Sequence, residues 1–350
     1  MRVIFLLVSI AFIFSCKPKA SVSSEEMNSS ETVSEAITDF TIVFASCNDQ
    51  DRPQPLWKPI LKHAPDVFIW GGDNIYADTA DMEKMQKDYN KVKSNPEYVA
   101  LANTTEIIGT WDDHDYGKND AGKEWEMKAP AQQLFLDFIE VPKNDPLRKQ
   151  EGIYYSKKYT MAEGSVKVIL LDTRTFRDAL NRSPIKGRRY DPWPMGEGGT
   201  VLGATQWKWL QNELNDNTTD FTMIVSSIQF LADEHGWEKW GNHPSEVEKM
   251  KTLLQNAKAN NIFIVSGDRH LAEISRTEVP GLSYPLIDFT TSGLTHTFPD
   301  SAAPANSYRV GKVIQDLNFG VLQFNFKKET VTFEIRGEND VEFVTYVQQF

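Results

Sequence analysis

Cysteine is scarce in this chain, whose 350 residues include only two, Cys16 and Cys47. No network of disulfide bonds can therefore hold the fold together. The sequence also lacks a long run of lysine and arginine, and its formal net charge is -12, so a nucleic-acid-binding surface is not indicated. The hydrophobic share of 40% and the charged share of 25% are close to globular averages, which argues against wholesale disorder.

The apolar run at the N-terminus is too short to span a membrane comfortably as a helix. Residues 3–14 follow a single basic residue and have the length of a signal-peptide core. The run ends at Ser15 and Cys16, and a small residue directly before a cysteine resembles the bacterial lipobox. We expect residues 1–15 to be a lipoprotein signal peptide and Cys16 to carry lipid, with ordinary signal-peptidase cleavage nearby as the alternative.

Residues 16–38 contain almost no large apolar side chains and are rich in serine, glutamate, threonine and alanine. This composition predicts a flexible tether between a bacterial membrane and a folded catalytic domain at residues 39–350. We expect an extracytoplasmic monomer, in the periplasm or at the cell surface. If Cys16 carries lipid, Cys47 has no disulfide partner, and it is then either a small buried hydrophobe or a metal-binding thiolate.

Short apolar runs alternate with amphipathic segments along most of the chain. Runs without polar alternation are typical of central strands covered on both faces, and they occupy residues 40–45, 66–70, 105–110, 166–171, 221–226 and 261–265. Helices are predicted at residues 131–139, 204–214 and 244–259, and antiparallel strands at 320–326, 330–336 and 343–347. This order predicts a layered α/β or α+β domain with a C-terminal antiparallel meander.

Polar residues that can act as ligands follow each of the six buried strands. In chain order they are SCND at 46–49, GGDNIYAD at 71–78, WDDHD at 111–115, DTR at 172–174, SIQ at 227–229 and SGDRH at 266–270. Open α/β sheets place their sites at the carboxyl ends of strands. The residue preferences of ordinary turns explain any one of these segments. The same explanation would have to hold for all six, so we predict a functional site at this edge of the sheet.

The segment GTWDDHDYGKND, residues 109–120, crowds aspartates around a histidine. Carboxylates this close take up protons unless cations bind them. Oxygen ligands suit Ca²⁺, Mg²⁺ or Mn²⁺, whereas thiolate, phenolate and imidazole suit a more polarising transition metal. Two metals about 3.5–4 Å apart form the clamp used for in-line attack on phosphorus, in which one lowers the pKa of a bound water and the other steadies the phosphate oxygens.

The ordered set ASCND, GGDNIYAD, WDDHDYGKND, LDTR and SGDRH resembles the alkaline phosphatase D (PhoD-like) family of metallophosphoesterases, which is similar to purple acid phosphatases. The resemblance covers residues 40–325, and WDDHD together with GDxIYAD is very specific. It implies a four-layer sandwich of two β-sheets flanked by helices, with a metal centre between the sheet edges. It also implies Fe³⁺ in a thiolate–phenolate site and one or two Ca²⁺ in carboxylate sites, with Zn²⁺ or Mn²⁺ as the alternative.

The same resemblance implies which residues bind the metals. The iron site is expected to draw on Cys47, Asp73, Tyr76 and His270, and the second site on Asp73, Asp112, Asp113 and Asp268. Asp73 would bridge the two sites. Gln229 occupies the place where the wider superfamily has a metal-binding histidine, so it is a doubtful ligand.

Three further residues are expected to act at the substrate: His114, Asn119 and Arg174. His114 resembles an imidazole that hydrogen-bonds the substrate phosphate or protonates the leaving oxygen. Asn119 is expected to contact phosphate or to organise the residues around the site. Two roles are open to Arg174, because a guanidinium suits phosphate and equally suits a salt bridge to a nearby carboxylate.

Together these features predict a tethered extracytoplasmic hydrolase of phosphate esters, acting as a phosphodiesterase, a phosphomonoesterase or both. The substrate would be a soluble organophosphate, or a polymer or headgroup such as teichoic acid or a phospholipid. One alternative is a phospholipase D-like diesterase that acts on membrane lipid. Another is a surface lipoprotein that binds metal or ligand without catalysis, although the presence of both Asp73 and His114 argues against a degenerate site.

Overall fold

The computed structural model describes residues 38–299 and 303–350. The expected signal peptide, the lipid-bearing Cys16 and nearly all of the expected tether lie outside these residues. Within the described part of the chain, no helix combines the length and the apolar character needed to cross a membrane.

The first sheet has six strands in the order β15-β14-β13-β1-β2-β3. Its strands are β1 (Phe40–Ala45), β2 (Val67–Gly71), β3 (Glu106–Thr110), β13 (Asn318–Asn325), β14 (Thr330–Gly337) and β15 (Glu342–Gln349). β1, β2 and β3 run parallel, whereas β13, β14 and β15 form an antiparallel meander beside β1. The three N-terminal strands and the C-terminal meander predicted from the sequence are confirmed.

The second sheet has seven strands in the order β12-β10-β11-β9-β8-β5-β4. They are β4 (Tyr155–Thr160), β5 (Ser165–Leu170), β8 (Phe221–Val225), β9 (Ile262–Ser266), β10 (Ala272–Thr277), β11 (Leu286–Thr291) and β12 (Arg309–Ile314). The central strands β5, β8, β9 and β11 are parallel. A short ribbon of β6 (Asn181–Arg182) and β7 (Tyr190–Asp191) lies outside both sheets.

The helices cover the outer faces of the sheets, except for one short helix, α4, which follows β3 at the edge of its sheet. They are α1 (Trp57–Lys62), α2 (Met82–Lys93), α3 (Pro96–Ala102), α4 (Asp113–Tyr116), α5 (Lys128–Phe138), α6 (Gly203–Leu214) and α7 (Pro244–Gln255). The three predicted helices correspond to α5, α6 and α7. Helices α2 and α3 were not predicted from the sequence, although each begins at a capping residue. The side chain of Asp81 accepts hydrogen bonds from the first turn of α2, and that of Asn95 from the first turn of α3.

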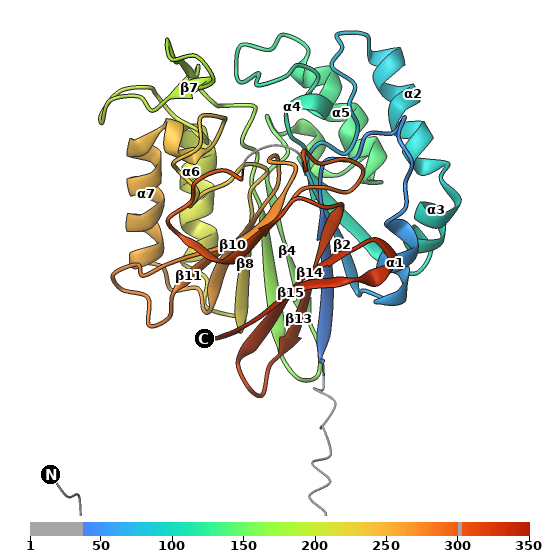
Figure 1. The fold of residues 1–350 in the computed structure, drawn as a ribbon, viewed down its shortest axis with the longest axis vertical. Coiled ribbons are helices and arrows are strands. Elements are labelled where there is room, and N and C mark those ends of the chain that lie inside the picture. Colours follow the sequence, from blue (N-terminus) through green and yellow to red (C-terminus); the bar gives the residue numbers. More distant parts are fainter. Residues whose placement is uncertain (1–37, 300–302) are drawn as a thin grey trace, which may run out of the picture. The chain divides into compact units, whose positions relative to one another are not determined.

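Three apolar clusters separate four layers of secondary structure, as the resemblance implied. Side chains from β1 and β2 pack under α1, α2, α3 and α5, a second cluster fills the space between the sheets, and a third lies under α6 and α7. Figure 1 shows the two sheets between these helix layers. Along β1, Val43 packs toward the helices, while Ile42 and Phe44 face the other sheet, which explains the continuous apolar run.

The carboxyl ends of the parallel strands from both sheets meet at one edge of the sandwich. Ser227, which follows β8, donates a hydrogen bond of 2.8 Å to Asp112, which follows β3. The backbone carbonyl of Ser227 also accepts a hydrogen bond of 3.0 Å from Gly267 after β9. These contacts fix the two sets of loops together, so the polar segments predicted at strand ends are brought to a single place.

Candidate metal centre

Four of the expected ligands have a backbone conformation that non-glycine residues rarely adopt. Cys47, Asp73, Asp268 and His270 have φ values of 61°, 50°, 69° and 54°, in the left-handed region. All four lie in the loops directly after β1, β2 and β9. Residues held in this conformation cluster at functional sites, where the surrounding structure directs a side chain to a required position.

Cys47, Asp73, Tyr76 and His270 form the first ligand cluster. The thiol Sγ lies 3.6 Å from Asp73 Oδ2, which also accepts a 3.3 Å hydrogen bond from the Tyr76 hydroxyl. That hydroxyl lies 3.3 Å from His270 Nε2. Ligand atoms of Cys47, Asp73 and His270 all lie within 4.8 Å of one another. The structure thus brings together all four residues expected at the iron site, and their donor atoms suit a transition metal.

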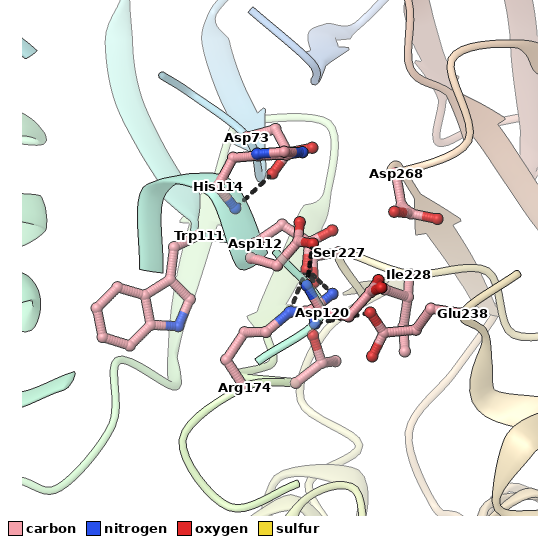
Figure 2. Close-up of polar contacts among 12 residues, drawn as sticks. Asp73, Trp111, Asp112, His114, Asp120, Arg174, Ser227, Ile228, Glu238 and Asp268 are labelled. Atoms are coloured by element: carbon pink, nitrogen blue, oxygen red, sulfur yellow. Dashed lines mark hydrogen bonds and ion pairs between the residues drawn. The ribbon is translucent and has the colours of Figure 1, made fainter. Parts of the chain in front are cut away.

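Asp112, Asp113 and Asp268 form the second ligand cluster, and Asp73 joins it to the first. Oxygens of the three aspartates lie within 4.8 Å of one another, and those of Asp73 and Asp113 are equally close to His114. Figure 2 shows Asp268 facing Asp73 and Asp112 from another loop. Each of the three aspartates has one buried oxygen without a hydrogen-bond partner among the described residues. Unpaired buried oxygens are costly, and these fit oxygen-preferring cations.

Burial shifts the pKa values of these groups toward their uncharged forms. It raises the pKa of Asp268 to about 7, and it raises the pKa of the Cys47 thiol well above its usual range, with the Asp73 charge adding to the effect. Burial lowers the pKa of His270 to about 3, so this imidazole is neutral and available as a ligand near pH 7. A bound cation would replace the protons that the buried acids otherwise retain.

His114 lies at the wall of a cavity beside both clusters. Its Nδ1 lies 2.6 Å from Asp78 Oδ2, and its ring packs against Tyr76 with centroids 4.2 Å apart. Its backbone N–H donates to Asp73 Oδ1 over 3.2 Å. Burial opposes the charged imidazole, but nearby carboxylates, led by Asp113, raise the pKa of His114 to about 11. The ring is therefore held, as a hydrogen-bond donor, where a substrate can reach it.

Arg174 is fully buried and does not line the cavity. Its guanidinium pairs with Asp112, and it lies 2.7 Å from Glu238 Oε2 (Figure 2). Glu238 in turn pairs with Arg177 over 2.9 Å. Of the two roles left open by the sequence, these contacts match the salt bridge. Arg174 thus contacts one of the expected metal-binding carboxylates, that of Asp112.

Asn119 lines the cavity and orients one of the carboxylates. Its Nδ2 donates to Asp113 Oδ2 over 2.7 Å, and its Oδ1 accepts from Arg189 over 2.9 Å. Gln229 does not line the cavity, and its buried amide nitrogen donates over 2.8 Å to Glu273 in the second sheet. That hydrogen bond supports the doubt about Gln229 as a metal ligand.

The cavity that residues of both ligand clusters line has a volume of about 480 Å³. Several of its lining residues were not identified from the sequence, among them Asp120, Arg189, Glu238, Arg269 and Phe298. Asp120 and Arg269 belong to the segments WDDHDYGKND and SGDRH, so their place in the sequence was a usable signal. Arg189 and Glu238 come from long connections without a motif, and their path over the site is set only by tertiary packing.

Comparisons with known proteins agree with this geometry. The family model for PhoD-like phosphatase matches residues 42–335. "Alkaline phosphatase D" of Bacillus subtilis (strain 168) is 21% identical over an alignment of 291 residues, and the match covers 69% of this chain and 48% of that protein. The chain therefore spans about half the length of this curated relative.

Solved structures show the same fold at low sequence identity. A structure of PhoD superposes with a TM-score of 0.68 at 18% identity, covering 89% of this chain and 69% of the other. A dimetal phosphatase from Danio rerio gives a TM-score of 0.56 at 12% identity, covering 90% of this chain and 100% of the other. Since the family model matches most of the sequence, this chain belongs to the PhoD-like phosphatase family.

Proposed function

We propose that this protein is a metal-dependent hydrolase of phosphate esters. The observation that carries the proposal is that Asp73 belongs to the thiol–imidazole cluster and also groups with Asp113, a member of the aspartate cluster. Residues of both clusters line the same cavity, as does His114. Metal ions held in such paired sites lower the pKa of a coordinated water and neutralise phosphate oxygens.

The chain's own residues orient the groups around the phosphate. Asp78 holds His114 through Nδ1, which leaves Nε2 as the ring nitrogen available to a phosphate oxygen or to the leaving oxygen. Asn119 fixes the Asp113 carboxylate, and Arg174 fixes that of Asp112. Because these contacts exist before substrate binds, little reorganisation is needed when charge develops on the phosphate.

We assign Fe³⁺ to the cluster of Cys47, Asp73, Tyr76 and His270, and one or two Ca²⁺ to the aspartate cluster. Thiolate and phenolate ligands favour a polarising transition metal, and oxygen-only ligands favour Ca²⁺. Zn²⁺ or Mn²⁺ in both clusters is the alternative. Elemental analysis of the purified protein distinguishes these assignments.

The purified protein is expected to release 4-nitrophenolate from bis(4-nitrophenyl) phosphate, from 4-nitrophenyl phosphate or from both. Treatment with a chelator should abolish the release, because it would remove the cations that the buried carboxylates require. The absorbance of 4-nitrophenolate measures both results. An enzyme specific for membrane lipid would ignore both reagents and cleave phospholipid vesicles, whereas a metal-binding lipoprotein would cleave none of these substrates.

We also propose that the protein is anchored by lipid on Cys16 at an extracytoplasmic face of a bacterial membrane. The lipobox-like sequence before Cys16 and the polar segment after it support this location. Replacing Cys16 by serine is expected to move the protein from the membrane fraction to the soluble fraction with its specific activity unchanged. Fractionation followed by immunoblotting measures this, and a Cys16→Ser protein that stays with the membrane would contradict the anchor.

A further inference from the structure

A histidine and two arginines among the residues that line the cavity can carry positive charge: His114, Arg189 and Arg269. The first two each lie 2.6 Å from a carboxylate oxygen. Arg269 differs, because the one carboxylate within ion-pair range, that of Asp268, lies 3.9 Å from its guanidinium, beyond hydrogen-bonding distance. Within residues 38–299 and 303–350, Arg269 is thus the only one of these three residues without a close carboxylate partner.

The backbone holds Arg269 at the cavity. Arg269 lies between Asp268 and His270, whose positive φ values turn the loop sharply on either side of it. Its side chain is only 13% exposed, and its Nε is buried without a hydrogen-bond partner in the described part of the chain. The guanidinium packs over the Trp237 ring, with Cζ 5.6 Å from the centroid. A cation buried in this way is costly unless a ligand supplies acceptors.

Phosphate is the anion that fits this position. Asp268, the one carboxylate within ion-pair range of Arg269 among the described residues, also belongs to the aspartate cluster, so its charge would be shared with a cation when that cluster is filled. Arg269 would then require acceptors from outside the chain. A guanidinium matches the spacing of phosphate oxygens and can bind two of them at once. A phosphate placed against the ligand clusters would lie in the same cavity as Arg269.

The outer wall of the cavity is apolar. Trp237 is 46% exposed and Phe298 is 57% exposed, and Leu271 and Pro304 line the same space. The volume of about 480 Å³ is more than a phosphate group alone occupies. An exposed aromatic face beside a charged pocket is suited to a planar or apolar group attached to the phosphate.

We propose that Arg269 binds a phosphate oxygen of the ester and that Trp237, which supports the guanidinium, packs against the ester's organic group. Esters with an aromatic or otherwise apolar group are then the preferred substrate class. This inference rests on the proposed hydrolysis of phosphate esters. It makes Arg269 a substrate-binding residue and Trp237 a residue that determines specificity.

The test of Arg269 compares the metal-loaded parent with Arg269→Gln and Arg269→Lys. Inorganic phosphate is the probe, its binding is measured by calorimetry, and elemental analysis reports the metal content of each protein. Removing a charged hydrogen-bond donor is expected to weaken phosphate binding by about 10- to 100-fold in Arg269→Gln. Arg269→Lys should lie between this variant and the parent, and KM for esters should rise more than kcat falls. Arg276→Gln, at a 44% exposed arginine of β10, is the matched control and should bind phosphate like the parent.

Each outcome decides the role of Arg269. Arg269→Gln with full metal content and parental phosphate affinity would overturn the proposal. Loss of metal in both Arg269 variants would also overturn it, since that result would show a structural role. A parent that binds phosphate through Arg269 but cleaves no ester would refute the proposed hydrolysis and leave the phosphate contact standing.

The test of Trp237 compares two esters in a Trp237→Leu variant. The KM for 4-nitrophenyl phosphate is expected to rise by about 3- to 10-fold, as for the loss of one aromatic contact, while the KM for glycerol phosphate changes less. An equal change in KM for both esters would contradict the proposed role of Trp237, because the residue would then not discriminate between the organic groups.

Discussion

Replacing Asp73 by asparagine is expected to abolish the turnover of phosphate esters and to remove metal from both clusters. Asp73 is shared between the cluster that contains Cys47 and the one that contains Asp113, so a single lost charge weakens both. Its φ of 50° lies in the left-handed region, which asparagine tolerates better than most residues. The backbone should therefore be preserved, and the loss can be attributed to the carboxylate.

The expected fall in kcat/KM for Asp73→Asn is at least about 10³-fold, in the range seen when a group that stabilises transition-state charge is removed. Elemental analysis and turnover of a 4-nitrophenyl ester measure the two effects on the same preparation. Asp51→Asn, at an exposed carboxylate paired with Lys91, is the matched control and should behave like the parent. Parental activity in Asp73→Asn would contradict the shared role of Asp73.

A Cys47→Ala variant separates the two clusters. Cys47 belongs to the first cluster alone, so we expect this variant to lose iron and to retain calcium, while Asp73→Asn loses both. Alanine and cysteine have the same Cβ, so the strain at φ 61° is unchanged. Zinc or manganese that is unaffected by Cys47→Ala would leave a metal centre but contradict the iron–calcium assignment.

The sequence predicted the strands and the place of the site because both depend on local patterns. The buried run of β2 is apolar at every position, since its side chains face a helix layer on one side and the second sheet on the other. Asp73 follows this strand directly, and parallel strands bring their carboxyl ends to one edge. Those two facts are sufficient to expect Asp73 near Asp113, which follows the neighbouring strand β3, whereas the place of Asp268 beside them was implied by the family resemblance.

Tertiary packing decided the features that the sequence did not predict. Glu238 lies in the long connection between β8 and α7, and nothing in its local sequence indicates a salt bridge to two buried arginines. The choice between phosphate and carboxylate as the partner of Arg174 depended on the path of that same connection. Arg269 is adjacent to an expected ligand, but its lack of a close carboxylate is visible only in three dimensions.

Replacing Arg174 by methionine is expected to lower the free energy of unfolding by about 3–5 kcal/mol, the usual effect of removing one partner from a buried ion pair. Arg174 and its partners Asp112 and Glu238 are essentially inaccessible to solvent, so water cannot compensate for the lost cation. The pairing joins the loop after β3 to the connection after β8, and its loss should loosen the side of the cavity formed by these segments. Urea unfolding at pH 8 with chelator present measures the effect without a contribution from bound metal.

Two comparisons make the Arg174 prediction specific. Arg276→Met, at a partly exposed ion pair, should change the unfolding free energy by no more than about 0.5–1 kcal/mol. Because Glu238 pairs with Arg174, the double variant Arg174→Met with Glu238→Gln should be less destabilised than the sum of the two single variants. If Arg174→Met instead kept its stability and lost affinity for inorganic phosphate, Arg174 would have to reach the substrate, and the buried salt bridge would not be its function.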